Sequence, residues 1–244
     1  MYQFDKRYLY IMIGIIILMI GYRYLTDINA LITLLLTIPA VLIAITFHEF
    51  AHAFAADKLG DDTPRRQGRL NLNPLSHLDP IGSLMLVFAG FGWGKPVEIN
   101  PRNFTRRISM STGEAIVSIA GPLMNFLLAI VFSIIFFVIG RFAPTFVITQ
   151  IGSIIMTLLN VTVIINVGLG VFNLIPLPPL DGSKVLRNVL PYRGREWLDR
   201  YSQIFYVVFL VLWIFGIAGQ IISPIINVVY NGIFLGIGTL FTLF

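Results

Sequence analysis

The sequence contains no cysteine among its 244 residues, and only 12% of those residues are charged. The lack of cysteine excludes disulfide bonds and thiolate metal ligands. Soluble domains usually carry about 25% charged residues, so the low charged fraction argues against an ordinary water-soluble domain. Hydrophobic residues make up 57% of the chain and the mean hydropathy is +0.84, which indicates a protein surrounded by lipid.

Long apolar runs dominate the chain, and a helix needs about 20 apolar residues to cross a hydrocarbon layer about 30 Å thick. The sequence therefore predicts an all-α polytopic membrane protein with about six transmembrane helices, at residues 8–25, 30–56, 113–140, 147–172, 203–222 and 224–243. The last two are separated at Ser223-Pro224. We expect them to form either a tight helical hairpin or one kinked helix with a surface segment.

The predicted helices form a single membrane-embedded domain over residues 1–244, with a core of about 30–200. Two extra helical regions, 8–25 and 203–243, flank this core. No small-residue cleavage site follows the first apolar run, so we expect a retained helix rather than a cleaved signal.

Lysine and arginine are distributed unevenly. All of them except Arg23 and Arg141 lie in three segments, residues 1–7, 57–112 and 184–202. Cytoplasmic loops are enriched in these residues, so we expect a cell-membrane protein with these segments and both termini in the cytoplasm. The net charge of +5 then follows from membrane topology and requires no nucleic-acid partner.

Residues 81–94 are apolar but too short to span a membrane, and they contain four glycines. Both flanking residues, Asp79 and Lys95, belong to a segment that we place in the cytoplasm. Irregular backbone at membrane depth occurs only where protein or a water-filled cavity covers it. The segment is therefore predicted to be a re-entrant loop or hairpin; the alternative is a loop lying on the membrane surface.

An HExxH motif, His48 to His52, lies in the C-terminal half of the predicted helix 30–56. Residues four apart share one helix face, so both imidazoles can bind one metal ion while Glu49 stays free as a base. Imidazoles with an adjacent carboxylate favour Zn²⁺. A metal ion would also offset the cost of these polar groups in a membrane, about 2.5–3.5 kcal/mol for a charged residue. The alternative is a polar network between helices.

A catalytic zinc site takes three protein ligands, so a third ligand is needed. Asp181 follows a proline-rich stretch after the apolar run 147–172, at a depth similar to that of the two histidines. Its alternative role is to cap the next helix in a Pro-Leu-Asp-Gly turn. His77, in a turn-rich stretch between Pro74 and Pro80, is the other candidate ligand.

These motifs together resemble the site-2 protease family of intramembrane metalloproteases, in a compact bacterial subgroup without PDZ or CBS domains. HEFAH at 48–52 matches the family's HExxH, and NLIPLPPLDG at 173–182 is similar to its second signature. The intervening segments that are also similar are GRLNLNPLSHLDPIG at 68–82, FGWGKPVEINPRNF at 91–104 and AGPLMNF at 120–126.

The resemblance implies that His48, His52 and Asp181 bind one Zn²⁺ per chain and that Glu49 is the general base. It also implies a role in catalysis for Asn125, and a similar one for Asn173; the alternative for both asparagines is a hydrogen bond between helices. The expected function is an intramembrane zinc metalloprotease that cuts transmembrane or membrane-associated proteins near the cytoplasmic face. The alternative is a metal or proton transporter or channel that uses the same polar cluster. The sequence leaves the oligomeric state and the substrate open.

Overall fold

The computed structural model describes residue 22 and residues 26–89, 93–105 and 107–242. Within these residues the chain is helical, without β-strands, so the predicted all-α class is confirmed. The helices are α2 (Ile28–Lys58), α3 (Thr63–Arg66), α4 (Pro74–His77), α5 (Pro80–Ala89), α6 (Met110–Phe142), α7 (Pro144–Val147), α8 (Gln150–Asn173), α9 (Asp181–Val189), α10 (Tyr192–Arg200), α11 (Ser202–Ile214) and α12 (Ile217–Thr242). The predicted helix 8–25 lies outside the described residues.

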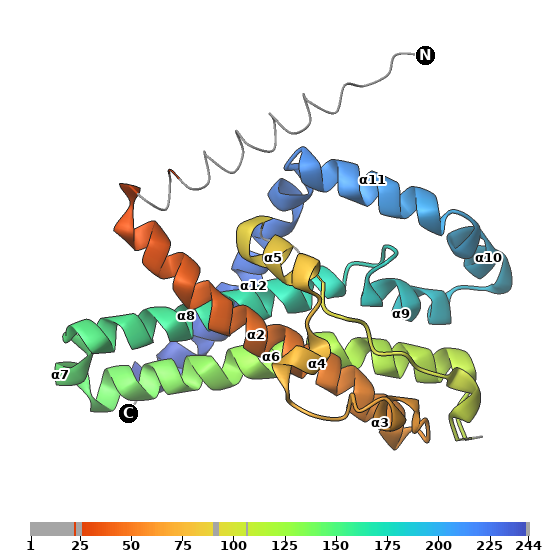
Figure 1. Cartoon of the computed structure of the whole chain (residues 1–244), viewed down its shortest axis with the longest axis horizontal. Helices are drawn as coiled ribbons and strands as arrows, with labels where there is room; N and C mark the ends of the chain where they lie inside the picture. Colours follow the sequence, from red (N-terminus) through yellow and green to blue (C-terminus); the bar gives the residue numbers. More distant parts are fainter. Residues whose placement is uncertain (1–21, 23–25, 90–92, 106, 243–244) are drawn as a thin grey trace, which may run out of the picture.

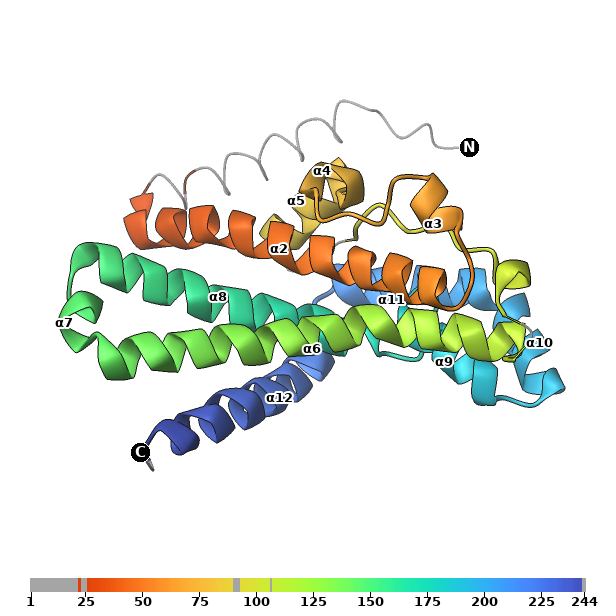
Figure 2. The same cartoon turned by 90° about the horizontal axis from the view of Figure 1, so that it is seen from below.

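Four helices, α2, α6, α8 and α12, are long and apolar enough to cross a membrane. Helices α2, α6 and α8 all contact one another, and α12 contacts α6 and α8 (Figures 1 and 2). Large apolar side chains such as Leu127 and Val131 point outward from this bundle and are exposed. An outer surface of this kind is expected where the solvent is lipid.

Polar residues begin each of the first three long helices. Asp27 accepts hydrogen bonds from the backbone of Asn29 and Ala30 at the start of α2. Ser109 and Thr149 accept similar bonds at the starts of α6 and α8. These side chains satisfy backbone N–H groups that a helix leaves unpaired at its first turn.

The predicted break between the last two helices is wrong. The structure divides the C-terminal region at Gly216, whose φ of +73° favours glycine, and Pro224 lies inside α12. Membrane helices tolerate an internal proline because neighbouring groups satisfy the freed carbonyl. Of the two predicted alternatives, the structure resembles one long helix with a short accompanying segment, since α11 has only 13 residues.

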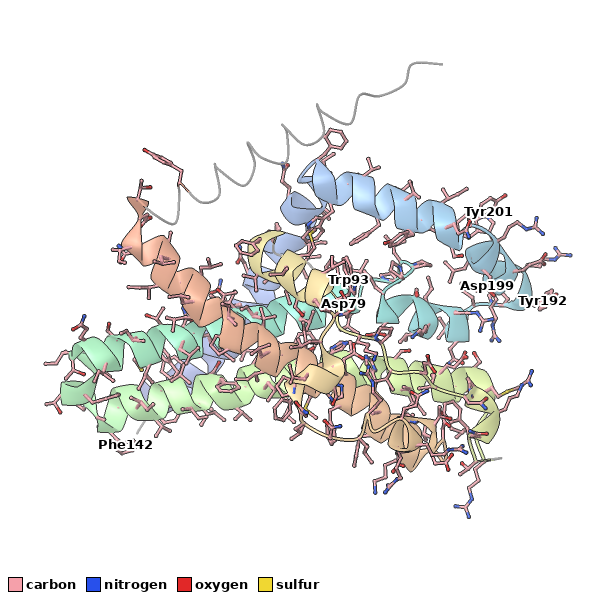
Figure 3. The ribbon with its side chains drawn as sticks, viewed as in Figure 1. Asp79, Trp93, Phe142, Tyr192, Asp199 and Tyr201 are labelled. Atoms are coloured by element: carbon pink, nitrogen blue, oxygen red, sulfur yellow. The ribbon has the colours of Figure 1, made fainter. Side chains whose placement is uncertain are left out.

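The C-terminus lies at the end of the bundle that also holds α7, and α9 and α10 lie at the other end (Figures 1 and 2). Phe142 marks the α7 end and Tyr192 the opposite end in Figure 3. Of the five predicted spans that fall on described residues, the structure has four helices long and apolar enough to cross a membrane, and the predicted span 203–222 is replaced by the shorter helix α11 and the start of α12.

The segment predicted to be a re-entrant loop begins and ends at the same place, and its helix α5 packs against α2. Leu78 and Gly94 form an antiparallel bridge, and the Lys95 amide donates to the His77 carbonyl at 2.8 Å. Asp79 and Trp93 accordingly lie close together beside α5 (Figure 3). The described parts of segment 81–94 thus start and end side by side, and the first part is the helix α5 rather than irregular backbone.

Candidate metal centre

The C-terminal half of α2 carries the HExxH residues on one helix face. His48, Glu49 and His52 are all buried, with relative exposures of 5%, 8% and 8%. The Nε2 atoms of the two histidines lie 3.0 Å apart. The helical spacing predicted from the sequence thus brings both imidazoles to one point.

Asp181 completes the cluster from the first residue of α9. Its Oδ2 lies 3.2 Å from His48 Nε2 and 3.1 Å from His52 Nε2. The three side chains form the one group of potential metal ligands found among the described residues, with ligand atoms within 4.8 Å of one another. Gly182 packs against the Leu174 backbone, where a Cβ would lie 2.5 Å from the carbonyl carbon, so the residue after Asp181 must be small.

Helix α6 orients both imidazoles through their other ring nitrogens. His48 Nδ1 lies 2.6 Å from Asn125 Oδ1, and His52 Nδ1 lies 2.7 Å from the Val117 carbonyl oxygen. Both partners accept hydrogen bonds, so each Nδ1 must carry the proton and donate it. In the neutral rings both Nε2 atoms therefore present lone pairs toward Asp181.

This donor set fits a divalent metal ion. Two neutral Nε2 atoms and a carboxylate oxygen converge, and all three are acceptors at about 3 Å from one another. Acceptors this close repel one another unless a metal ion or a proton lies among them. Two imidazoles and a carboxylate are a ligand set that catalytic zinc uses.

Gly121 allows α6 to approach the two histidines. A Cβ at this position would clash with the His52 ring and would lie 2.7 Å from His48 Cε1. The close contact of α6 with α2 at this point therefore depends on the absence of a side chain.

The Glu49 carboxylate lies beside the metal ligands but outside their group. Its Oε2 accepts a hydrogen bond from the Val97 amide at 3.2 Å, and its side chain lines a cavity. Glu49 is thus placed as the sequence predicted, next to the ligands and free of them.

Asn125 is fully buried and does not line the cavity. Its Nδ2 donates to the Ala44 carbonyl at 3.1 Å and to Asn166 Oδ1 at 2.9 Å, while its Oδ1 accepts from His48. Asn125 therefore contacts a histidine rather than the space where a substrate would lie. Sequence reasoning missed Asn166, although an asparagine inside an apolar helix is a visible signal.

His77, the alternative third ligand, lies outside the cluster. It is fully buried, and its Nε2 donates to the Asn71 carbonyl at 2.7 Å. Burial lowers the pKa of the His77 imidazole, so it is neutral at physiological pH. The structure therefore brings Asp181, and not His77, to the two HExxH histidines.

Asn173 lines the cavity, and its Nδ2 donates to the Leu169 carbonyl at 3.1 Å.

A cavity of about 570 Å³ adjoins the cluster. Its polar wall carries His48, Glu49, His52 and Asp181. The apolar side chains around them come from α2, α8, α11 and the segment after α5 and include Ile45, Trp93, Leu169, Phe172, Tyr206 and Phe209. A mostly apolar cavity with a few convergent polar groups is typical of an active site.

An all-α membrane bundle with a buried HExxH motif, a third carboxylate and a free glutamate at a cavity defines a membrane metallopeptidase. The chain belongs to Peptidase family M50: the model of that family matches residues 97–216, which include Asn125 and Asp181. The family is that of the site-2 proteases, so the resemblance seen in the sequence is confirmed.

Curated relatives agree with this assignment. The chain is 34% identical over 187 residues to "Putative zinc metalloprotease YwhC" of Bacillus subtilis (strain 168), covering 77% of this chain and 84% of the relative. It is 30% identical over 186 residues to "Putative zinc metalloprotease Rip2" of Mycolicibacterium smegmatis, covering 74% of this chain and 67% of the relative. No solved structure matches the chain significantly.

Proposed function

We propose that His48, His52 and Asp181 hold one zinc ion and that Glu49 is the general base of an intramembrane zinc metalloprotease. The enzyme class follows from the peptidase family and its zinc metalloprotease relatives. The observation that carries the residue assignment is the convergence of three acceptor atoms beside a free carboxylate. An ion pathway would not require that free carboxylate, and the peptidase family favours hydrolysis over the transporter alternative.

When bound, zinc would polarise the scissile carbonyl and make water a nucleophile at neutral pH. The Glu49 carboxylate accepts the proton of the attacking water and then returns it to the departing amine. The Val97 amide holds one Glu49 oxygen, which leaves the other oxygen to handle the proton.

Asn125 and the Val117 carbonyl act on the reaction through the histidines. Each fixes the tautomer and the orientation of one imidazole, so that both Nε2 atoms face Asp181. We assign Asn125 a positioning role in place of the direct catalytic role that the family resemblance implied, because it does not line the cavity.

The substrate is a transmembrane or membrane-associated protein whose cleavage site enters the cavity in an unwound form. Apolar walls such as Ile45, Leu169 and Phe209 suit the side chains of a membrane segment. A helical peptide bond is shielded by its own backbone, so local unwinding must precede attack. Tyr206 and Phe209 come from α11, which suggests that the C-terminal region completes the cavity of one domain over residues 1–244.

We place the metal centre near the cytoplasmic face of the cell membrane, because the basic segments 57–112 and 184–202 lie at that end of the chain's helices. Both α3 and the pair α9 and α10 lie at this end, whereas α7 lies at the other (Figure 2). The C-terminal end of α12 lies with α7, so we propose that it faces the side opposite these basic segments, in place of the cytoplasmic C-terminus expected from the sequence.

The function is tested with Glu49→Gln. The amide is close in size to the carboxylate but cannot accept the proton, so cleavage should fall about 10²–10⁴-fold while zinc content stays at the native level. Purified enzyme in liposomes is given a panel of synthetic single-span peptides with a fluorophore and a quencher, and zinc is measured by elemental analysis. Native cleavage by Glu49→Gln would rule out the proposed chemistry.

A further inference from the structure

Arg69 is a buried guanidinium on the loop between α3 and α4, with a relative exposure of 5%. It donates through Nη2 to the backbone carbonyls of Lys95 and Pro96, the latter at 3.0 Å. A buried arginine is costly unless its donors are well used. Here Nη2 alone holds the chain immediately before Val97, while Nη1 is buried without a hydrogen-bond partner.

The segment held by Arg69 runs along the catalytic face of α2. At its start, a Cβ on Gly94 would lie 2.8 Å from the Ile45 side chain and 3.0 Å from Glu49 Oε1. At its end, the Val97 amide donates to Glu49 Oε2. Residues 94–97 therefore make one hydrogen bond to the Glu49 carboxylate and approach it closely at Gly94, where a side chain would not fit, and we call them the Glu49 support.

Arg69 and His77 hold the Glu49 support through its backbone. The His77 carbonyl accepts from the Lys95 amide at 2.8 Å, and Arg69 binds the two carbonyls that follow. The His77 ring is itself fixed by its bond to the Asn71 carbonyl. The Glu49 support is thus held by residues of the segment 69–78 and itself holds the Glu49 carboxylate through the Val97 amide.

The charge of Arg69 fits the same arrangement. Burial lowers the pKa of the Arg69 guanidinium, and the negative charges of Glu49 and Glu98 oppose this effect. An arginine stays protonated in proteins, so a permanent positive charge lies near the general base.

We propose that Arg69 is a positioning residue for Glu49: by binding the Lys95 and Pro96 carbonyls it sets the place of the Val97 amide, which in turn orients the Glu49 carboxylate. This inference rests on the proposed function, since it takes Glu49 as the base. A small displacement of a reacting group can cost about 10²-fold in rate.

The main test compares Arg69→Met with Arg195→Met. Arg195 is a matched control because its guanidinium also binds two backbone carbonyls, those of Leu190 and Asn188, but far along the chain from Glu49. In the liposome assay, with the single-span peptide that the native enzyme cleaves fastest, Arg69→Met should lower kcat roughly 10- to 10²-fold. KM should change less than about threefold, and zinc content should stay native. Arg195→Met should change kcat less than about twofold.

Hydrogen exchange and a double-mutant cycle separate positioning from a general structural role. In Arg69→Met the amides of residues 94–97 should exchange at least about tenfold faster, with α2 and α6 unchanged. In a Glu49→Ala background, where nothing remains to orient, Arg69→Met should lower the residual rate less than about twofold. An equal loss in both backgrounds, loss of zinc, or native kcat in Arg69→Met would overturn the proposal.

Arg69→Lys keeps the proposal testable if Arg69→Met does not fold. Lysine retains the charge and a donor but lacks the planar fork, so it should give intermediate kcat and intermediate exchange. Native values or zinc loss in Arg69→Lys would again contradict the inference. If Glu49→Gln itself cleaves at the native rate, the proposed function fails; if Glu49→Gln is inactive and the Arg69 variants are fully active, only this inference fails.

Discussion

The helices α2, α6 and α8 differ from α11 and α12 in the contacts that hold them. In the first group buried polar side chains connect all three helices, from His48 to Asn125 and from Asn125 to Asn166. The C-terminal helices contact the bundle mainly through aromatic rings, such as Phe209 against Phe172 and Phe234 against Phe137, with a half-buried hydrogen bond from Tyr230 Oη to Asn160 Oδ1.

The two kinds of contact have different consequences in a membrane. Lipid provides no hydrophobic driving force between helices, so helices are held by packing and by hydrogen bonds. Packed aromatic rings can shift against one another, whereas a buried hydrogen bond requires one geometry. The structure therefore places the metal ligands where the geometry is fixed by polar bonds. Tyr206 and Phe209, which line the cavity, lie on α11, where the contacts with the bundle can shift at less cost.

The largest effect is expected from Gly121→Ala, which adds a side chain where α6 lies closest to the two histidines of α2. The added methyl would occupy space that the His48 and His52 rings fill, so α6 must move away from α2. We expect zinc binding and cleavage to be lost. Gly140→Ala is the matched control on the same helix, because its Cβ would meet only Met156 at 4.0 Å. If Gly121→Ala binds zinc as Gly140→Ala does, the tight contact of α6 is not required.

A smaller effect is expected from Asn125→Ala, which removes the hydrogen-bond partner of His48 Nδ1. Loss of such a partner typically weakens metal affinity about 10- to 100-fold. Asn160→Ala provides the comparison, because Asn160 accepts a 2.6 Å bond from Tyr230 Oη on α12 and should change zinc affinity less than about twofold. Competition with a zinc chelator measures both. Equal affinities for the two variants would remove the distinction between the two groups of helices.

The smallest effect on activity is expected from cysteines placed at the two ends of the bundle. The chain has no cysteine of its own, so single cysteines at Ser109, Thr145 and Thr242 can be labelled without background. All three variants should keep activity within about twofold of native. Thr145 and Thr242 should react with a membrane-impermeant reagent from outside, and Ser109 should not. Outside labelling at Ser109 would reverse the proposed orientation.

The convergence of His48, His52 and Asp181 could be predicted from the sequence because it depends on local spacing and on depth in the membrane. The HExxH helix places His48 and His52 together, and the order of the apolar runs brings Asp181 to the same depth. The all-α class followed similarly from apolar runs long enough to span a bilayer.

Other features depend on contacts between distant segments and could not be predicted in this way. The bond from His48 to Asn125 and the approach of Gly121 arise only when α2 and α6 pack. The break at Gly216 was missed because proline is the stronger helix-breaking signal in water, and Pro224 lies nearby. Residues 80–89 form a helix because only Gly82, of the four glycines in segment 81–94, lies inside them.

The central claim, that His48, His52 and Asp181 together hold zinc, is tested most directly by the zinc content of two single variants. Asp181→Ala removes the carboxylate of the cluster, and His77→Gln removes the only other candidate raised by the sequence while keeping a donor for Asn71. Elemental analysis of purified protein should give one zinc per chain for the native enzyme and for His77→Gln, and a small fraction of that for Asp181→Ala. Full zinc in Asp181→Ala, with loss of zinc in His77→Gln, would contradict the proposed metal centre.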